Sequence, residues 1–290
     1  MKKLILFIAI IFIWCAITKA DVVIKRKTIA DMAGLMTMET NISEIIKNDK
    51  SRSIVSSKMT GGTMVKLGGK ESTATILITR IDKGISYGID PVKKIYSELP
   101  LSSMKELFAT SESQSSKNDN SEYIWTTDVK AMDQMRKVNG FDCKNIVGNA
   151  VGVKKYNVKD SAFITYEMCL ADDIAGKTEI EQYQKKYSDA LGIDEIWSEN
   201  NLGWAMKDYG PQIEVLNRKI RSAGGYPIKT IVDIESNFNP AGDMDGNPND
   251  VKLSQDGRHK ILSMITEVLS IEQKPADDAQ FEVPAGYKKK

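Results

Sequence analysis

Residues 138–170 read VNGFDCKNIVGNAVGVKKYNVKDSAFITYEMCL, and this stretch decides the fold class. Asn139-Gly140 is the commonest two-residue turn of a β-hairpin. Two strand-like segments follow, at 141–153 and 161–170, and a polar connection at 155–159 joins them. This order predicts a second, longer hairpin. Hairpins pair their strands antiparallel, so we expect an antiparallel sheet here.

The second hairpin carries two of the three cysteines of the chain. If it folds about Tyr156, Cys143 and Cys169 lie directly opposite each other, close enough to form a disulfide. Closing a loop of this length would stabilise the fold by about 3–4 kcal/mol in the chain-entropy model. The alternative is two buried free thiols. In either case the role is structural, because the spacing resembles neither a redox CxxC motif nor a zinc site.

Towards the N-terminus, residues 22–98 are typical of a β-meander. From Met36 onward, apolar and polar residues alternate with the period of a half-buried strand. The runs 74–81 and 85–89 are joined through Asp82-Lys83-Gly84, and a short strand follows at 94–98 after Asp90-Pro91. The glycine-rich stretch 60–69 is expected to be a plain loop, because it lacks the features of a nucleotide site.

The rest of the chain mixes helix, loop and strand. A short helix is expected over 102–108, and the serine-rich stretch 110–121 is expected to be a flexible surface loop. Apolar residues recur every three or four positions over 177–223, which indicates a helical insertion at about 177–224. Strands are expected at 226–235 and 260–272, although the second could also be a helix. The outline is an α+β chain, mostly antiparallel β, with a single domain over 21–290.

The first twenty residues have the pattern of a cleavable secretory signal. Lys2 and Lys3 precede an apolar run over 4–15, and Thr18 and Ala20 are small residues at the positions that a signal peptidase inspects. We expect cleavage after residue 20. Two alternatives stay open: a permanent anchor, for which the apolar run is short, and a lipid-modified Cys15, which the bulky Trp14 disfavours. The protein is thus expected to be exported, to a periplasm, to the cell envelope or out of the cell.

The net charge of the chain restricts the classes of molecule that it is expected to bind. Without residues 1–20 the chain has 37 basic and 39 acidic side chains, a net charge near −2. This balance argues against nucleic acid as a partner, which normally requires a basic excess. No second apolar stretch is long enough to cross a membrane, so the processed chain is expected to have no transmembrane segment.

Candidates for catalysis and metal binding are few, and we expect neither an enzyme nor a cofactor. His259 is the only histidine, so a nucleophile and histidine arrangement would have to use it. The stretch 243–254 imitates the start of a calcium loop, but it lacks the required glycine and glutamate. The calcium ligands to test there are Asp243, Asp245, Asn247 and Asp250.

Aromatic residues gather in and beside the helical insertion, and methionines gather in the first strands. The aromatic residues could pack the helices onto the sheet, or they could form a lid over an apolar ligand. Methionines 32, 36, 38, 59 and 64 would suit an adaptable apolar wall, although they are equally ordinary core residues. The expected ligand-binding residues are Met36, Met38, Tyr183, Tyr187, Trp197 and Trp204.

The chain ends with FEVPAGYKK at 281–289, which resembles a family of exported bacterial proteins with a domain of unknown function that close with F-x-V-P-x-G-Y. Other pieces fit in the same order: DVVI at 21–24, IDPVKKIYSE at 89–98 and VNGFDC at 138–143. The resemblance covers nearly all of the processed chain. Cys169 and the length of the insertion from Gly192 to Gly225 depart from the family pattern.

That family is similar in organisation to the periplasmic lipoprotein carriers of the LolA and LppX type. The resemblance implies an open, curved antiparallel sheet, an unclosed half-barrel, with helices covering the concave face. It also implies a cavity for lipid or acylated cargo, such as the acyl chain of a lipoprotein, without catalysis. The alternative is a protein-interaction or scaffold module of the envelope, whose interior is filled by its own helices.

Overall fold

The computed structural model describes residues 21–66, 74–106, 123–157, 160–193, 209–237 and 257–290. Several sequence predictions lie outside these ranges: the signal at 1–20, the serine-rich loop at 110–121, Trp197, Trp204 and the calcium candidates Asp243, Asp245, Asn247 and Asp250.

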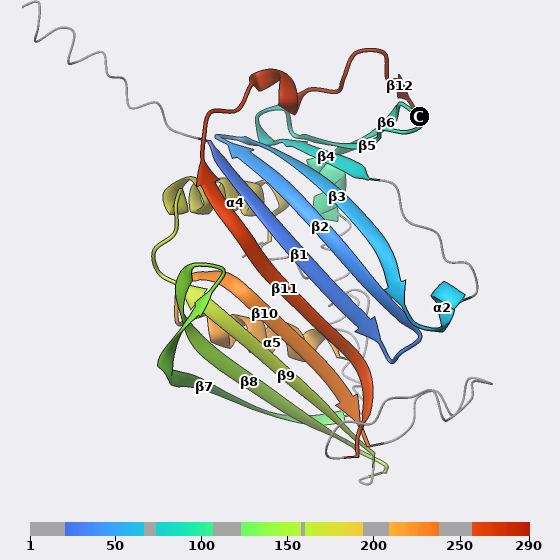
Figure 1. Cartoon of the computed structure of the whole chain (residues 1–290), viewed down its shortest axis with the longest axis vertical. Coiled ribbons are helices and arrows are strands. Elements are labelled where there is room, and N and C mark those ends of the chain that lie inside the picture. Colours follow the sequence, from blue (N-terminus) through green and yellow to red (C-terminus); the bar gives the residue numbers. More distant parts are fainter. Residues whose placement is uncertain (1–20, 67–73, 107–122, 158–159, 194–208, 238–256) are drawn as a thin grey trace, which may run out of the picture.

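Twelve strands form one sheet in the spatial order β12-β6-β5-β4-β3-β2-β1-β11-β10-β9-β8-β7 (Figure 1). The strands are β1 (Val22–Met32), β2 (Met36–Lys47), β3 (Lys50–Gly61), β4 (Thr75–Arg80), β5 (Ile85–Asp90), β6 (Ile95–Pro100), β7 (Tyr123–Val138), β8 (Phe141–Lys154), β9 (Ser161–Ala171), β10 (Tyr226–Ser236), β11 (His259–Gln273) and β12 (Lys288–Lys289). The helices are α2 (Thr63–Lys66), α4 (Lys177–Leu191) and α5 (Gly210–Arg221), with short 3-10 turns at η1 (Ile81–Lys83) and η4 (Asp278–Phe281). Residues 101–106 are also helical.

The sheet is curved, mostly antiparallel and unclosed, as predicted. β1 to β6 are neighbours in chain order, which confirms the meander. β7 to β11 form a second run of consecutive neighbours, and β11 then pairs with β1. The only parallel pair among the described strands is β12 with β6. β7 and β12 are the two ends of the sheet, so the described strands do not close into a barrel.

Two predicted turns take the expected backbone shape. Asn139 (φ 50°) and Gly140 (φ 92°) are both left-handed and join the paired residues Val138 and Phe141, as a two-residue hairpin requires. Between β4 and β5 the chain makes the 3-10 turn η1, which ends at Gly84 with φ 64°. Glycine suits that position because it has no Cβ to clash in the left-handed region.

Both long helices lie on the same face of the sheet. Along β10 the even-numbered residues are buried in strict alternation. Tyr226 and Ile228 belong to the core cluster that includes α4, whereas Val232 and Ile234 belong to the cluster that includes α5. Because side chains two residues apart along a strand share a face, α4 and α5 cover one face, which we call the inner face (Figure 1).

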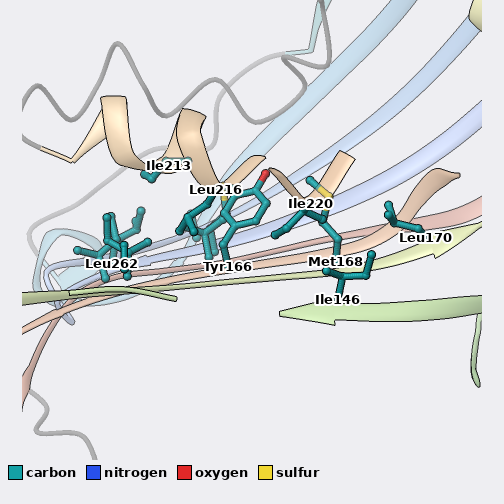
Figure 2. Packing of buried hydrophobic residues seen from close by; sticks show 14 residues of the cluster. Ile146, Tyr166, Met168, Leu170, Ile213, Leu216, Ile220 and Leu262 are labelled. Atoms are coloured by element: carbon teal, nitrogen blue, oxygen red, sulfur yellow. The ribbon is translucent and has the colours of Figure 1, made fainter. Parts of the chain in front are cut away.

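The helix α5 packs closely against β8 and β9. Figure 2 shows Leu216 and Ile220 directed at Tyr166 and Met168 of β9, and both helix residues are fully buried. Gly148 of β8 allows this approach. A Cβ at that position would lie 3.1 Å from Leu216 Cδ2 and 3.2 Å from Ile220 Cδ1, so these two side chains would have to move by a few tenths of an ångström.

The predicted disulfide between Cys143 and Cys169 is present, with a Cα–Cα distance of 5.3 Å. The predicted register was wrong, because Cys169 pairs with Asn145 rather than with Cys143. The reason lies in the connecting loop, where the Lys154 amide donates to Asp160 O at 3.0 Å. This bond makes the hairpin turn about residue 157 rather than Tyr156, so the two cysteines are diagonal neighbours that still bridge.

The C-terminal motif packs on the opposite side of the sheet, which we call the outer face. Phe281 is fully buried and clusters with Ile78 of β4 and Ile89 of β5. Val283 and Tyr287 are partly buried against the same cluster. The motif therefore presents alternate residues to the sheet. We call residues 276–287 the C-terminal segment, and it ends where β12 joins the edge strand β6.

Phe281→Ala is expected to lower the free energy of unfolding by about 3–5 kcal/mol, because it empties a fully buried aromatic site. Urea unfolding followed by circular dichroism measures this loss. The control is Val92→Ala, since Val92 is 67% exposed and its truncation should change stability by less than about 0.5 kcal/mol. Equal effects of the two substitutions would contradict the assigned packing of the motif.

Replacing both cysteines by serine is expected to cost about 3–4 kcal/mol, because the disulfide closes a loop with a sequence separation of 26. Urea unfolding of the oxidised protein, with and without a reductant, measures the effect. The reductant should destabilise the native chain and leave the double serine variant unchanged. A native chain that is insensitive to the reductant would show that the bridge does not contribute to stability.

Candidate functional site

Four methionines lie together on the inner face at one end of β1, β2 and β3. The register pairs Met32 with Met36, and it aligns Ala30 with Met38 and Met38 with Met59. Ala30 belongs to the core cluster that includes α5, so the methionines aligned with it lie on the face that the helices cover. Met32 is 39% exposed and the other three are partly buried. We call Met32, Met36, Met38 and Met59 the methionine patch; the side chain of Met64 lies outside the description.

A polar belt crosses the inner face between the methionine patch and α4. Thr28 and Thr266 share a hydrogen bond of 2.9 Å, and Thr40 and Ser57 share another of 2.9 Å. Each links neighbouring strands through side chains on the inner face. The belt therefore separates an apolar region under α4 from the apolar methionine patch.

Arg26 is the charged centre of this belt and is only 3% exposed. Its guanidinium donates to Glu44 at 2.8 Å and to the Tyr226 hydroxyl at 2.8 Å. A buried arginine requires such partners because the loss of hydration is costly. A cavity of about 30 Å³ borders Arg26, Tyr166 and Thr266. This volume corresponds to about one water molecule, so this cavity is too small for a lipid.

Tyr183 and Tyr187 anchor α4 to the sheet. Their rings stack with centroids 6.0 Å apart, and the Tyr183 hydroxyl shares a 2.7 Å hydrogen bond with Ser51 of β3. Burial raises the pKa of both phenols, which therefore stay protonated at neutral pH.

The structure groups the predicted ligand residues at two separate places. Met36 and Met38 lie two residues apart on β2, within the methionine patch, whereas Tyr183 and Tyr187 belong to α4. Along β3, the distance from Ser51 beneath α4 to Met59 in the patch is about 26 Å at roughly 3.3 Å per residue. One small ligand therefore cannot contact both pairs.

His259 begins β11 and pairs in register with Ser236. Ser236 is fully buried, so its hydroxyl is closed to a substrate. Within the described ranges, no group of three or more His, Cys, Asp or Glu side chains could hold a metal ion. No helix among these same residues is long and apolar enough to cross a membrane.

The sequence reasoning missed Arg26, although a signal was present. Val22, Ile24, Arg26, Thr28 and Ala30 occupy alternate positions of one strand, and all but Arg26 are apolar or small. A long cation on the buried face of a strand requires a buried acceptor. That requirement could have identified Arg26 as a residue with a specific partner.

No family model and no curated protein matches this chain. Among solved structures, the crystal structure of the LolA superfamily protein NE2245 from Nitrosomonas europaea is similar at 8% sequence identity, covering 91% of each chain with a TM-score of 0.31. At this TM-score the two chains overlap too loosely for the similarity to support an argument.

Arg26→Ala is expected to lower the free energy of unfolding by about 3–5 kcal/mol. The substitution removes the guanidinium that pairs with the mostly buried carboxylate of Glu44 and leaves that charge unpaired. Replacing both residues by methionine should recover most of this loss, since no charge is then buried. Urea unfolding measures each variant.

The matched control is Arg136→Ala, which removes an exposed ion pair with Glu167. Exposed pairs contribute about 0–1 kcal/mol, so this change should have little effect. If Arg26→Ala is no more destabilising than Arg136→Ala, Arg26 does not have the assigned role.

Proposed function

We propose that this chain is an exported envelope protein that binds a hydrophobic ligand on the inner face of its sheet and catalyses no reaction. The ligand is a lipid or the acyl chain of a lipoprotein. The observation that carries the proposal is the methionine patch, a group of partly exposed apolar side chains on the face that also bears both long helices. The secretory pattern of residues 1–20 supports export.

The chemistry of the patch suits an acyl chain. Methionine side chains are flexible and polarizable, so they adapt to apolar surfaces of irregular shape. Leu35, in the turn between β1 and β2, is 48% exposed and adds an apolar side chain at the same end of the sheet. Covering this surface would stabilise the complex through the hydrophobic effect, at roughly 25 cal/mol per Å² of apolar area removed from water.

The packing of the inner face restricts where the ligand lies in this proposal. Beneath α5 the core is filled by Leu216, Ile220 and their neighbours, and the cavity beside Arg26 has the volume of about one water. An acyl chain would therefore lie on the methionine patch, outside the polar belt. Tyr183 and Tyr187 pack α4 onto the sheet on the other side of that belt. In this proposal, the inner face corresponds to the concave face that the sequence predicts.

A second function is favoured by the same close packing. An envelope scaffold or protein-interaction module needs no ligand cavity, and a largely self-filled inner face suits it. In that case the methionine patch would contact a protein partner. Cross-linking to one specific envelope protein, together with a ligand-free interior, would support this function over the first.

The double substitution Met36→Ser and Met38→Ser tests the proposal. We expect delipidated protein to take up fatty acid or phospholipid, and we expect the double variant to bind at least about tenfold more weakly, since it loses two apolar contacts. Fluorescence titration with a labelled fatty acid and a labelled phospholipid measures the affinity.

The matched control is Met132→Ser with Met135→Ser, two exposed methionines on the edge strand β7. This control should bind as the native chain does. Delipidated native protein that takes up neither lipid would contradict the proposed function. Equal weakening by both double variants would contradict the assignment to the methionine patch.

A further inference from the structure

A cavity of about 390 Å³ opens on the outer face, between the C-terminal segment and strands β3 to β5. Its size falls in the range of small-molecule sites. It is separate from the methionine patch, which lies on the other face of the sheet. The residues that line it are Arg52, Ile76, Ile78, Ile89, Ala279, Gln280, Glu282 and Pro284.

Three of the four sheet residues that line this cavity are isoleucines, and the fourth is Arg52. Ile76 and Ile78 belong to β4 and Ile89 to β5, and all three join the cluster around Phe281. The register pairs Ile76 with Ile89, so these two side chains are direct cross-strand neighbours. Ile78 and Ile89 are each only 1% exposed, so the partly exposed Ile76 supplies the hydrocarbon surface that is open to a ligand, and the other two lie beneath it.

Glu282 and Asp278 of the C-terminal segment are already paired with cations. Glu282 accepts hydrogen bonds from Arg80 and Lys83, and Arg80 also binds Asp82. Asp278 pairs with Lys50 at 3.0 Å and with Lys47 at 3.4 Å. Two of the three acids of the C-terminal segment thus bind cations other than Arg52, and the third, Asp277, accepts a hydrogen bond from the Ala279 amide.

Arg52 is the exception on this face. Within the described part of the chain, its guanidinium has neither a hydrogen-bond partner nor an ion-pair partner. It is only partly exposed, beside the three isoleucines. Burial lowers the pKa of this guanidinium, which nevertheless stays charged at neutral pH. A partly desolvated cation with nothing to offset its lost hydration favours the approach of an anion.

We propose that this outer cavity binds a small organic anion that carries a carboxylate or phosphate head on a short apolar chain. The head pairs with the Arg52 guanidinium, whose planar fork matches both groups. The apolar chain lies on Ile76, with Ile78 and Ile89 lining the cavity beneath it. Glu282 is an acid on the same cavity wall, so repulsion directs the anionic head to the Arg52 side.

The test follows the methyl signals of isoleucine and methionine by NMR during titration of the full processed chain with octanoate. We expect the signals of Ile76, Ile78 and Ile89 to shift and saturate. Octanol, which has the same chain and no charge, should bind at least about tenfold more weakly. Octyl phosphate, titrated in parallel, shows which of the two heads the site prefers.

Substitutions at Arg52 give the decisive comparison. Arg52→Gln should weaken octanoate binding about tenfold or more, whereas Arg52→Lys should retain part of the affinity because it keeps the charge. The matched control Arg136→Gln removes an exposed arginine of β7 and should bind as the native chain does. Unchanged methyl signals elsewhere in the spectrum show that each variant is folded.

Three results would overturn the proposal: isoleucine signals that do not move with either anion, octanol that binds as tightly as octanoate, or Arg52→Gln that binds as tightly as the native chain. Shifts confined to Met36 and Met38 would also overturn it, while supporting ligand binding at the methionine patch. The two proposals therefore fail independently.

Discussion

The antiparallel pairing of β1 with β11 is the constraint on which the rest of the structure depends. It joins the first described strand to the last long one, and so unites the run β1 to β6 with the run β7 to β11 in one sheet. Asp21 extends this junction, because its carbonyl accepts from the Lys274 amide at 2.9 Å and its carboxylate accepts from the Ala276 amide at 2.7 Å. These bonds direct the C-terminal segment onto the outer face.

The two faces of the sheet acquire different chemistry from this arrangement. On the inner face, the buried Arg26 and Glu44 pair lies between the region under α4 and the methionine patch. On the outer face, the F-x-V-P-x-G-Y motif covers β4 and β5, while Arg52 stays beside a cavity without a partner in the described residues. Each face therefore combines an apolar surface with buried or partly buried arginines. Arg26 on the inner face is paired with Glu44, and Arg80 on the outer face is paired with Asp82 and Glu282. Arg52 differs from both, because it has no partner among the described residues.

Local patterns predicted local structure well. The turn at Asn139-Gly140, the meander over 22–98 and the helical period over 177–223 depend on neighbouring residues, and all three are present among the described residues. The disulfide was also predicted, but the predicted register was wrong, because the hairpin turns about residue 157 and not about Tyr156. The pairing of β1 with β11 and the contact of Phe281 with Ile78 join distant parts of the chain, which sequence periodicity does not encode.

The proposed function requires that the inner face carries a hydrophobic ligand in the cell. Native mass spectrometry of the protein purified from the envelope of its own host, compared with its denatured mass, tests this most directly. If the protein binds a lipid, its native mass exceeds its denatured mass, and the difference matches a lipid extracted from the same sample. Equal native and denatured masses would contradict the proposed function and would favour the protein-interaction module instead.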